Sequence, residues 1–208
     1  MEFYHLQVNH ITNPIGYAIE YPVFSWKVKN MTGKHQKSAR IQVASDAEMK
    51  NILYDSGALS DASSTGFSAE MTLMPCTRYY WNVTVETDNA EQESSETAWF
   101  ETGKMDEPWK GKWITCNSIE NRHPRFETEV QLCPGKQVER ARLYICGFGL
   151  YEVYYDGEKI GEEYLTPYCN NYNQWAQYQT YDITDQLKEK GILSVLLGNG
   201  WYKGRFGF

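Results

Sequence analysis

The sequence lacks clustered positive charge, long apolar runs and any secretory leader pattern. Its 20 Lys and Arg residues are outnumbered by 27 Asp and Glu residues, which gives a formal net charge of −7. Nucleic-acid binding relies on clustered positive charge, so DNA and RNA are excluded as partners. No window approaches the 18 apolar residues of a membrane span, and the N-terminus has neither a basic region nor an apolar run. We therefore expect a cytoplasmic protein that binds no membrane.

Paired cysteines and metal-binding or nucleophile motifs are also missing. The cysteines are odd in number and form no C-x-x-C pair, which predicts free thiols in a reducing compartment. The four histidines lack metal-ligand spacing, and no G-x-S-x-G motif is present. The sequence thus predicts no metal centre built on His or Cys and no activated nucleophile. The five cysteines are Cys76, Cys116, Cys133, Cys146 and Cys169.

Aromatic residues, at 15%, and short β-rich runs are what the sequence does contain. Over residues 1–104 such runs alternate with turn signals, which predicts an all-β sandwich of the fibronectin type III or immunoglobulin kind. In "RYYWNVTVET", residues 78–87, apolar and polar positions alternate with the period of a half-buried strand. Trp26 and Trp81 are expected to be core residues of this domain. The expected strands cover residues 24–28, 39–45, 52–57, 66–71, 78–87 and 97–103.

Two local signals refine this first domain. Leu73, Pro75, Thr77 and Tyr79 form an L-x-P-x-T-x-Y pattern that resembles the tyrosine corner of fibronectin type III modules. By that resemblance the Tyr79 hydroxyl bonds to nearby backbone and has a structural role. The stretch 45–53 favours one or two helical turns, capped by its first or second residue.

A second β-domain is expected over residues 113–208, after a charged linker with proline and glycine at 105–112. Its strand pattern predicts a second β-sandwich, and the chain is expected to be truncated within it at the C-terminus. The Asp156-Gly157 pair predicts a hairpin, and residues 184–190 favour a short helix. The expected strands cover residues 124–132, 140–148, 149–157, 159–165, 176–183 and 192–200.

The stretch "ARLYICGFGLYEVYYDGEKIGEEYLTPYCNNYNQWAQYQTYDITDQLKEKGILSVLLGNGWYKGRFGF" resembles the N-terminal β-sandwich of bacterial α-L-rhamnosidases. The resemblance implies a jelly-roll-like, galactose-binding-like sandwich over residues 113–208. The same resemblance implies a parent glycosidase that removes terminal rhamnose with inversion, using two carboxylates in a downstream (α/α)6 barrel. It also implies that this chain alone is inactive and has no catalytic residue. Glu127 and Glu129 share a strand face, and we expect that face to be solvated.

Candidate carbohydrate-binding residues lie in the loop "TPYCNNYNQW" and in the terminal "GNGWYKGR". Aromatic rings stack on sugar faces, and amides bond sugar hydroxyls. By the family resemblance, Asn170 and Asn171 are also weak calcium candidates, although asparagine stands where a carboxylate would bind the ion more strongly. Alternatively, these amides cap their own turns. The candidates are Asn170, Asn171, Tyr172, Trp175 and Trp201.

Three hypotheses for function remain open at this point. The chain is a non-catalytic scaffold whose partners are its own catalytic domain and rhamnose-containing glycans, a stand-alone carbohydrate-binding module, or a protein-interaction module of the fibronectin type. Because the second sandwich is expected to lack its final strands, we also expect self-association through exposed sheet edges. The strand at 192–200 is expected to be one such edge. The terminal "GNGWYKGRFGF", residues 198–208, is expected to be the segment that exchanges between copies; alternatively, it is a disordered tail on a monomer.

Overall fold

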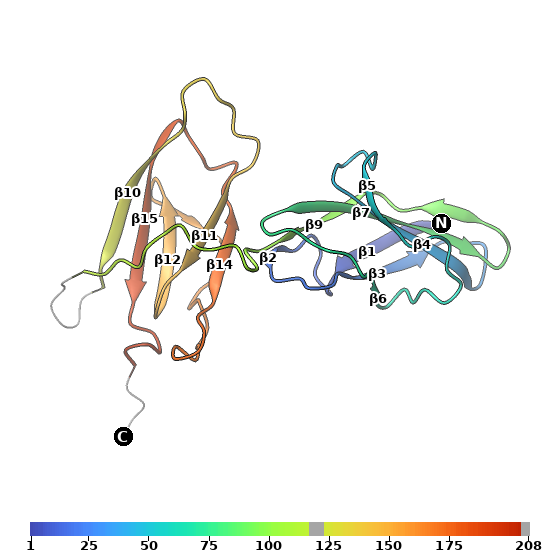
Figure 1. Ribbon diagram of the computed structural model, residues 1–208, viewed down its shortest axis with the longest axis horizontal. Helices are drawn as coiled ribbons and strands as arrows, with labels where there is room; N and C mark the ends of the chain where they lie inside the picture. The colour runs from blue at the N-terminus through green and yellow to red at the C-terminus, as the bar shows by residue number, and fades with distance from the viewer. Residues whose placement is uncertain (117–122, 205–208) are drawn as a thin grey trace. The chain divides into compact units, whose positions relative to one another are not determined.

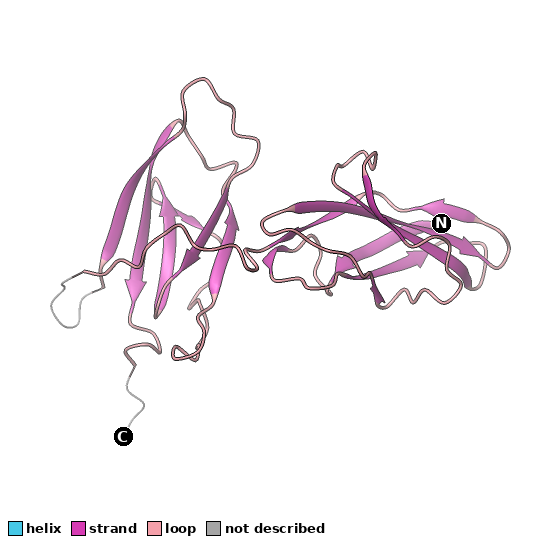
Figure 2. Cartoon of the chain, viewed as in Figure 1, coloured by secondary structure: helices cyan, strands magenta, loops and turns pink. Residues whose placement is uncertain are grey.

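The computed structural model describes residues 1–116 and 123–204, in two compact units, Met1–Pro108 and Trp109–Phe208 (Figure 1). The division falls within the stretch expected to be a linker. Within the described residues the structure consists of strands, turns and loops, which confirms the all-β prediction (Figure 2). No helix in this part of the chain is long and apolar enough to cross a membrane.

The first unit has the two sheets of an immunoglobulin-like sandwich. Six strands form one sheet, in the order β2-β9-β7-β4-β5 with β8 paired to β7, and three form the other, in the order β1-β3-β6. Sequence patterns missed β1, β2 and β8. The strands are β1 (Glu2–Val8), β2 (Ile15–Tyr17), β3 (Val23–Lys29), β4 (Gln36–Ala44), β5 (Ile52–Asp55), β6 (Phe67–Ser68), β7 (Arg78–Thr87), β8 (Gln92–Ser94) and β9 (Ala98–Thr102).

The core of the first unit lies between these sheets and is strongly aromatic. Every second residue of β7 is buried, as the alternation predicts. Trp81 on β7 packs on Phe24 of β3 with ring centroids 4.6 Å apart, and Trp26 is also fully buried. Removing such side chains from water stabilises the fold by about 1.5–3 kcal/mol each. Both tryptophans are therefore packing residues.

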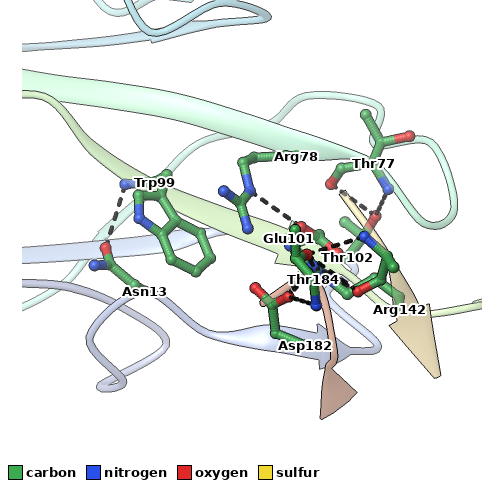
Figure 3. A network of polar contacts seen from close by, with 10 residues as sticks. Asn13, Thr77, Arg78, Trp99, Glu101, Thr102, Arg142, Asp182 and Thr184 are labelled. Atoms are coloured by element: carbon green, nitrogen blue, oxygen red, sulfur yellow. Dashed lines mark hydrogen bonds and ion pairs between the residues drawn. The ribbon is translucent and has the colours of Figure 1, made fainter. Parts of the chain in front are cut away.

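The tyrosine corner has the geometry that its sequence pattern implies. The Tyr79 hydroxyl accepts a hydrogen bond of 2.7 Å from the Met74 backbone N–H. Nearby, the buried Thr102 hydroxyl donates to the Met74 carbonyl at 2.6 Å. The same hydroxyl accepts from the Thr77 N–H at 3.0 Å (Figure 3). These hydrogen bonds hold the turn before β7 against β9. Figure 3 also shows Arg78 beside Glu101, an ion pair with a 3.0 Å Nε–Oε2 distance.

The second unit has a four-stranded sheet in the order β10-β15-β12-β13 and a two-stranded sheet of β11 and β14. Tyr151, Val153 and Tyr155 on β12 are buried between the sheets. Their partners on the facing sheet include Leu143 and Ile145. The strands are β10 (Arg125–Gln131), β11 (Arg142–Cys146), β12 (Leu150–Tyr155), β13 (Glu158–Ile160), β14 (Tyr178–Asp182) and β15 (Lys190–Gly198).

The Asp156-Gly157 hairpin between β12 and β13 is confirmed. Both residues have positive φ angles, +49° and +86°, which a tight hairpin turn of type I′ requires. The Asp156 carboxylate also accepts hydrogen bonds of 2.8 Å from the Ile192 N–H and the Lys188 ammonium group. This turn therefore also fastens the start of β15.

Both predicted helical segments are turns. At 184–190 the Thr184 hydroxyl donates to Asp182 at 2.6 Å and accepts from the Ala141 N–H at 3.0 Å. These contacts fix a turn that leads directly into β15. At 45–53 the Asp46 carboxylate accepts from the N–H groups of Lys50 and Asn51, which closes a turn before β5.

The prediction that the strand near 192–200 is a sheet edge is wrong. β15 lies between β10 and β12 and pairs antiparallel with both. One partner of β15 is β12. The other is β10, which precedes β15 by many residues in the sequence. The last four residues of the "GNGWYKGRFGF" segment, which we expected to exchange between copies, lie outside the described residues.

Candidate binding cavity

A cavity of about 610 Å³ opens in the second unit. Its walls come from the inner faces of both sheets, from the segment 109–116 and from residues 198–203 after β15. A cavity of this size is in the range of ligand pockets, and its lining is mostly apolar and aromatic. Its main side chains are those of Trp109, Trp113, Phe126, Tyr144, Ile145, Phe148, Tyr151, Val195, Leu197 and Tyr202.

The floor of the cavity continues the sandwich core. Phe126 on β10 and Val195 on β15 are direct register partners, and both are only half-buried. Tyr151 is almost fully buried, and its hydroxyl donates to the Ile145 carbonyl of the facing sheet at 2.9 Å. Burial raises the pKa of Tyr151, so its hydroxyl remains a hydrogen-bond donor. The cavity is therefore an uncovered end of the apolar core.

Four aromatic rings gather at one side of the cavity, and we name them the ring cluster: Trp113, Phe148, Tyr172 and Tyr202. Phe148 is at its centre, with ring centroids 4.6 Å from Trp113, 4.9 Å from Tyr202 and 5.5 Å from Tyr172. The Tyr172 and Tyr202 rings are 5.1 Å apart in an edge-to-face arrangement. Such pairs are favourable beyond their burial alone. The cluster joins four segments that are distant in the sequence.

Glycines place Phe148 in this cluster. Gly149 has a φ of +93°, and a Cβ there would lie 2.4 Å from the Gly198 carbonyl oxygen. Gly200 has a φ of +48°, and its Cβ would lie 2.8 Å from the Leu150 nitrogen. Only glycine permits this close approach of the two loops. The "GFG" and "GNG" stretches are thus explained by backbone contact.

The predicted carbohydrate-binding residues lie in different surroundings. Trp175 and Trp201 are each about half exposed, at 50% and 51%, and of the five residues only Tyr172 joins the ring cluster. Asn170 is buried; its Oδ1 accepts from the Gln177 N–H at 3.2 Å, and its Nδ2 has no hydrogen-bond partner. Asn171 donates to the Gln174 side chain at 3.2 Å. Both amides therefore support their own loop.

This loop does not fit calcium. The ion requires about six to eight oxygen ligands, usually including carboxylates. The stretch from Asn170 to Trp175 contains no carboxylate, and the Asn170 oxygen is already engaged. Within residues 1–116 and 123–204 no three His, Cys, Asp or Glu side chains are grouped as a metal site.

The carboxylates of β10 are paired with cations on a solvated face. Glu127 bonds Arg125 at 2.8 Å, and Glu129 bonds Lys190 at 2.9 Å. Each glutamate side chain is about half exposed, at 51%. Neither glutamate lines the cavity described above.

Three members of the ring cluster, Trp113, Phe148 and Tyr202, were missed from the sequence. In the sequence, the only feature that marks these residues is an aromatic side chain near glycines. The same feature is typical of β-turns, so it does not indicate a cluster. Trp109, expected in the linker, belongs to the second unit and packs edge-on against Tyr178 at 5.6 Å.

Comparisons with known proteins match nearly the whole chain. Residues 3–106 match the family described as "Rha78A-like, N-terminal immunoglobulin domain", and residues 136–208 match "Alpha-L-rhamnosidase N-terminal domain". An α-L-rhamnosidase of Formosa agariphila is 34% identical over 97% of this chain and 24% of its own length. One of Alteromonas sp. is 28% identical over 93% and 23%.

Solved structures agree with this result. The α-L-rhamnosidase from Dictyoglumus thermophilum is 29% identical with a TM-score of 0.85, over 97% of this chain and 25% of that one. The native enzyme from Aspergillus terreus has a TM-score of 0.77 at 22% identity, over 100% and 25%, which supports the fold alone.

Fold and matches together define a tandem β-sandwich region, immunoglobulin-like in its first unit. The chain belongs to the α-L-rhamnosidase family and corresponds to its N-terminal immunoglobulin-like and N-terminal domains. It spans about a quarter of the length of the relatives it matches.

Proposed function

We propose that this chain is the non-catalytic N-terminal region of an α-L-rhamnosidase and supports the catalytic part of that enzyme. The observation that carries the proposal is the match of both units to the N-terminal domains of these enzymes, over about a quarter of their length. The rhamnoside-cleaving carboxylates then belong to the remaining part of the protein. In this proposal that part is an inverting (α/α)6 barrel.

The polar groups of the described residues support a structural role. Charged side chains that approach one another are engaged in ion pairs within each unit, such as Arg78 with Glu101 and Arg142 with Asp182. The latter pair, at 2.6 Å, joins the directly opposed ends of β11 and β14. Side chains held in this way stabilise the strands that carry them.

The direct test is an assay of the purified 208-residue chain with a chromogenic aryl α-L-rhamnoside. We expect no hydrolysis above buffer. A variant with both β10 glutamates replaced, Glu127→Gln with Glu129→Gln, controls for contaminating enzyme, because a contaminant is indifferent to the substitution. Turnover by the wild-type chain that this variant loses would disprove the non-catalytic assignment.

A second candidate function is carbohydrate contact at the surface of the second unit. It is favoured by the half-exposed rings of Trp175 and Trp201. In this reading, a rhamnose-containing glycan stacks its sugar face on one of these rings. Titration of L-rhamnose, with and without calcium, tests it through tryptophan fluorescence. A saturable change that Trp175→Ala removes supports sugar binding, and a flat titration contradicts it.

A further inference from the structure

The first unit has a cavity of its own, which we name the β1 cavity. Its volume is about 720 Å³, within the range of ligand pockets. It is lined by β1, by Thr12 and Asn13, and by the segment 93–98 that runs from β8 into β9. β1 and β8 belong to different sheets, so the cavity lies at an open side of the sandwich.

The lining of the β1 cavity is mixed, unlike the mostly apolar lining of the cavity in the second unit. Phe3, Leu6 and Ala98 line it and also belong to the apolar core of the first unit. Most of the other side chains in the lining are polar, and they include Gln7 and Thr97. An apolar base with polar groups around it is typical of sites for small ligands.

A bulge in β1 shapes one wall of this cavity. The register of β1 against β3 shifts between Tyr4 and Gln7, so the two residues between them oppose a single residue of β3. His5 has a φ of +52°, in a region that residues other than glycine adopt infrequently. Consecutive residues of a regular strand point to opposite faces. Here the rings of Tyr4 and His5 are in contact, with centroids 5.2 Å apart and planes at 88°, and both residues line the cavity.

Two carboxylates in the segment 93–98 are free to meet a ligand. Glu93 and Glu96 are exposed, and neither side chain makes a hydrogen bond or an ion pair with residues 1–116 or 123–204. The backbone beside them is held in place. The buried Ser95 hydroxyl donates to the Glu96 carbonyl at 2.9 Å and accepts from the Val83 N–H at 3.1 Å.

Hydrogen-bond donors line the same cavity. The Asn13 Oδ1 accepts from the Trp99 N–H at 3.3 Å, which fixes the side chain (Figure 3). Its Nδ2, the Gln7 amide and the Thr97 hydroxyl bond no other residue in the described part of the chain. The β1 cavity therefore offers free donors and free acceptors beside two rings.

We propose that the β1 cavity binds a rhamnose-containing oligosaccharide. Sugar hydroxyl groups donate to carboxylates and accept from amides, and the C–H face of a sugar ring stacks on an aromatic ring. The ring for stacking is that of Tyr4, which is 39% exposed. This inference rests on the proposed function, because the parent rhamnosidase supplies the class of sugar.

Other classes of ligand fit this lining less well. An anion would meet two carboxylates that no cation neutralises. A metal ion needs several ligands at one point, and within residues 1–116 and 123–204 no three His, Cys, Asp or Glu side chains are grouped in that way. An organic cation would use the carboxylates but would leave the amide donors without an acceptor.

The probe is an α-L-rhamnosyl disaccharide, with maltose as a disaccharide that contains no rhamnose. Amide chemical shifts of the wild-type 208-residue chain are followed by NMR during titration with each sugar. We expect saturable shifts at Gln7, Asn13 and Thr97 with the rhamnosyl disaccharide, and at least tenfold weaker binding of maltose. This measurement needs no variant and so does not depend on the folding of one.

Two tyrosines provide a matched pair of variants. Tyr4 lines the cavity, whereas Tyr21 is 51% exposed and does not line it. We expect Tyr4→Ala to weaken binding of the disaccharide at least tenfold and Tyr21→Ala to change it less than threefold. Trp175→Ala removes the exposed ring considered for sugar contact in the second unit, and it should also change this binding less than threefold.

The absence of saturable shifts at the cavity amides, equal binding of maltose, or equal effects of the two tyrosine variants would overturn the inference. Shifts confined to residues 170–175 would also overturn it, because the sugar would then bind the second unit. So would cavity shifts produced by spermidine and not by the disaccharide, because the ligand would then be an organic cation.

The proposed function is tested separately, by deleting the matched region from the Formosa agariphila relative. If that enzyme keeps its activity and stability, the scaffold proposal fails. If it needs the region while the β1 cavity takes no sugar, only the binding inference fails.

Discussion

Replacing Tyr79 with phenylalanine tests the tyrosine corner, because it removes only the hydroxyl group. The substitution keeps the ring, which stacks on Phe100 at a centroid distance of 5.2 Å, and removes the hydroxyl that accepts from the Met74 N–H at 2.7 Å. The loss therefore isolates a hydrogen bond from aromatic packing. The Met74 carbonyl remains bonded to Thr102, so the turn keeps one of its two fastenings.

The expected loss of stability follows from the exposure of the two partners. Leaving a buried donor without an acceptor costs about 1–3 kcal/mol. The hydrogen bond between the Met74 N–H and the Tyr79 hydroxyl is only partly buried, so we expect about 1–2 kcal/mol. For a domain of about 100 residues this lowers the melting midpoint by roughly 4–15 °C.

Differential scanning calorimetry of the full chain measures this loss in the transition of the first unit. The matched control is Tyr80→Phe, because Tyr80 is the next residue on β7 and lies on the opposite, partly exposed face. We expect that control to shift stability by less than about 0.5 kcal/mol. Equal midpoints for Tyr79→Phe and wild type would show that the hydrogen bond contributes nothing and would refute the reasoning.

Three other predictions concern separate parts of the chain. Gly149→Ala should destabilise the second unit by about 1–3 kcal/mol, because its Cβ meets backbone at positive φ, whereas Gly157→Ala has open space and should lose less; equal urea midpoints would contradict this. The hydrogen bond from Arg40 holds the pKa of Asp55 at about 2, below its usual 3.8, so its stabilisation is present above pH 4 and lost as pH falls toward 2. Acid titration of Asp55→Asn should therefore lack this component, and an unchanged acid transition would show that the pair does not contribute. Trp175→Ala should leave the melting midpoint of the second unit within about 1 °C, since an exposed ring adds little to the core; a large drop would identify it as a packing residue.

Local sequence patterns predicted the elements whose determinants are close in the chain. The alternation along residues 78–87 sets β7 because each side chain is assigned to a face by the strand period alone. Asp156-Gly157 sets its hairpin because both positions need positive φ. The family resemblance, carried by longer motifs of the second half, was confirmed by the comparisons.

Features that depend on distant partners were not predictable in this way. Thr184 has the character of a helix cap, but its hydroxyl is engaged by Ala141 and Asp182, and a turn results. The ring cluster joins positions 113, 148, 172 and 202, so no local window contains its signal. The place of β15 in the middle of its sheet likewise depends on β10.

We propose that this chain supports the catalytic part of an α-L-rhamnosidase. The measurement that tests it most directly compares aryl rhamnoside hydrolysis by three forms of the Formosa agariphila relative: intact, with its matched region deleted, and with that region replaced by this chain. We expect the deletion to remove soluble activity and the replacement to restore it to within about tenfold of the intact enzyme. A deletion variant as active and as stable as the intact enzyme, or a replacement no better than the deletion, would contradict the claim.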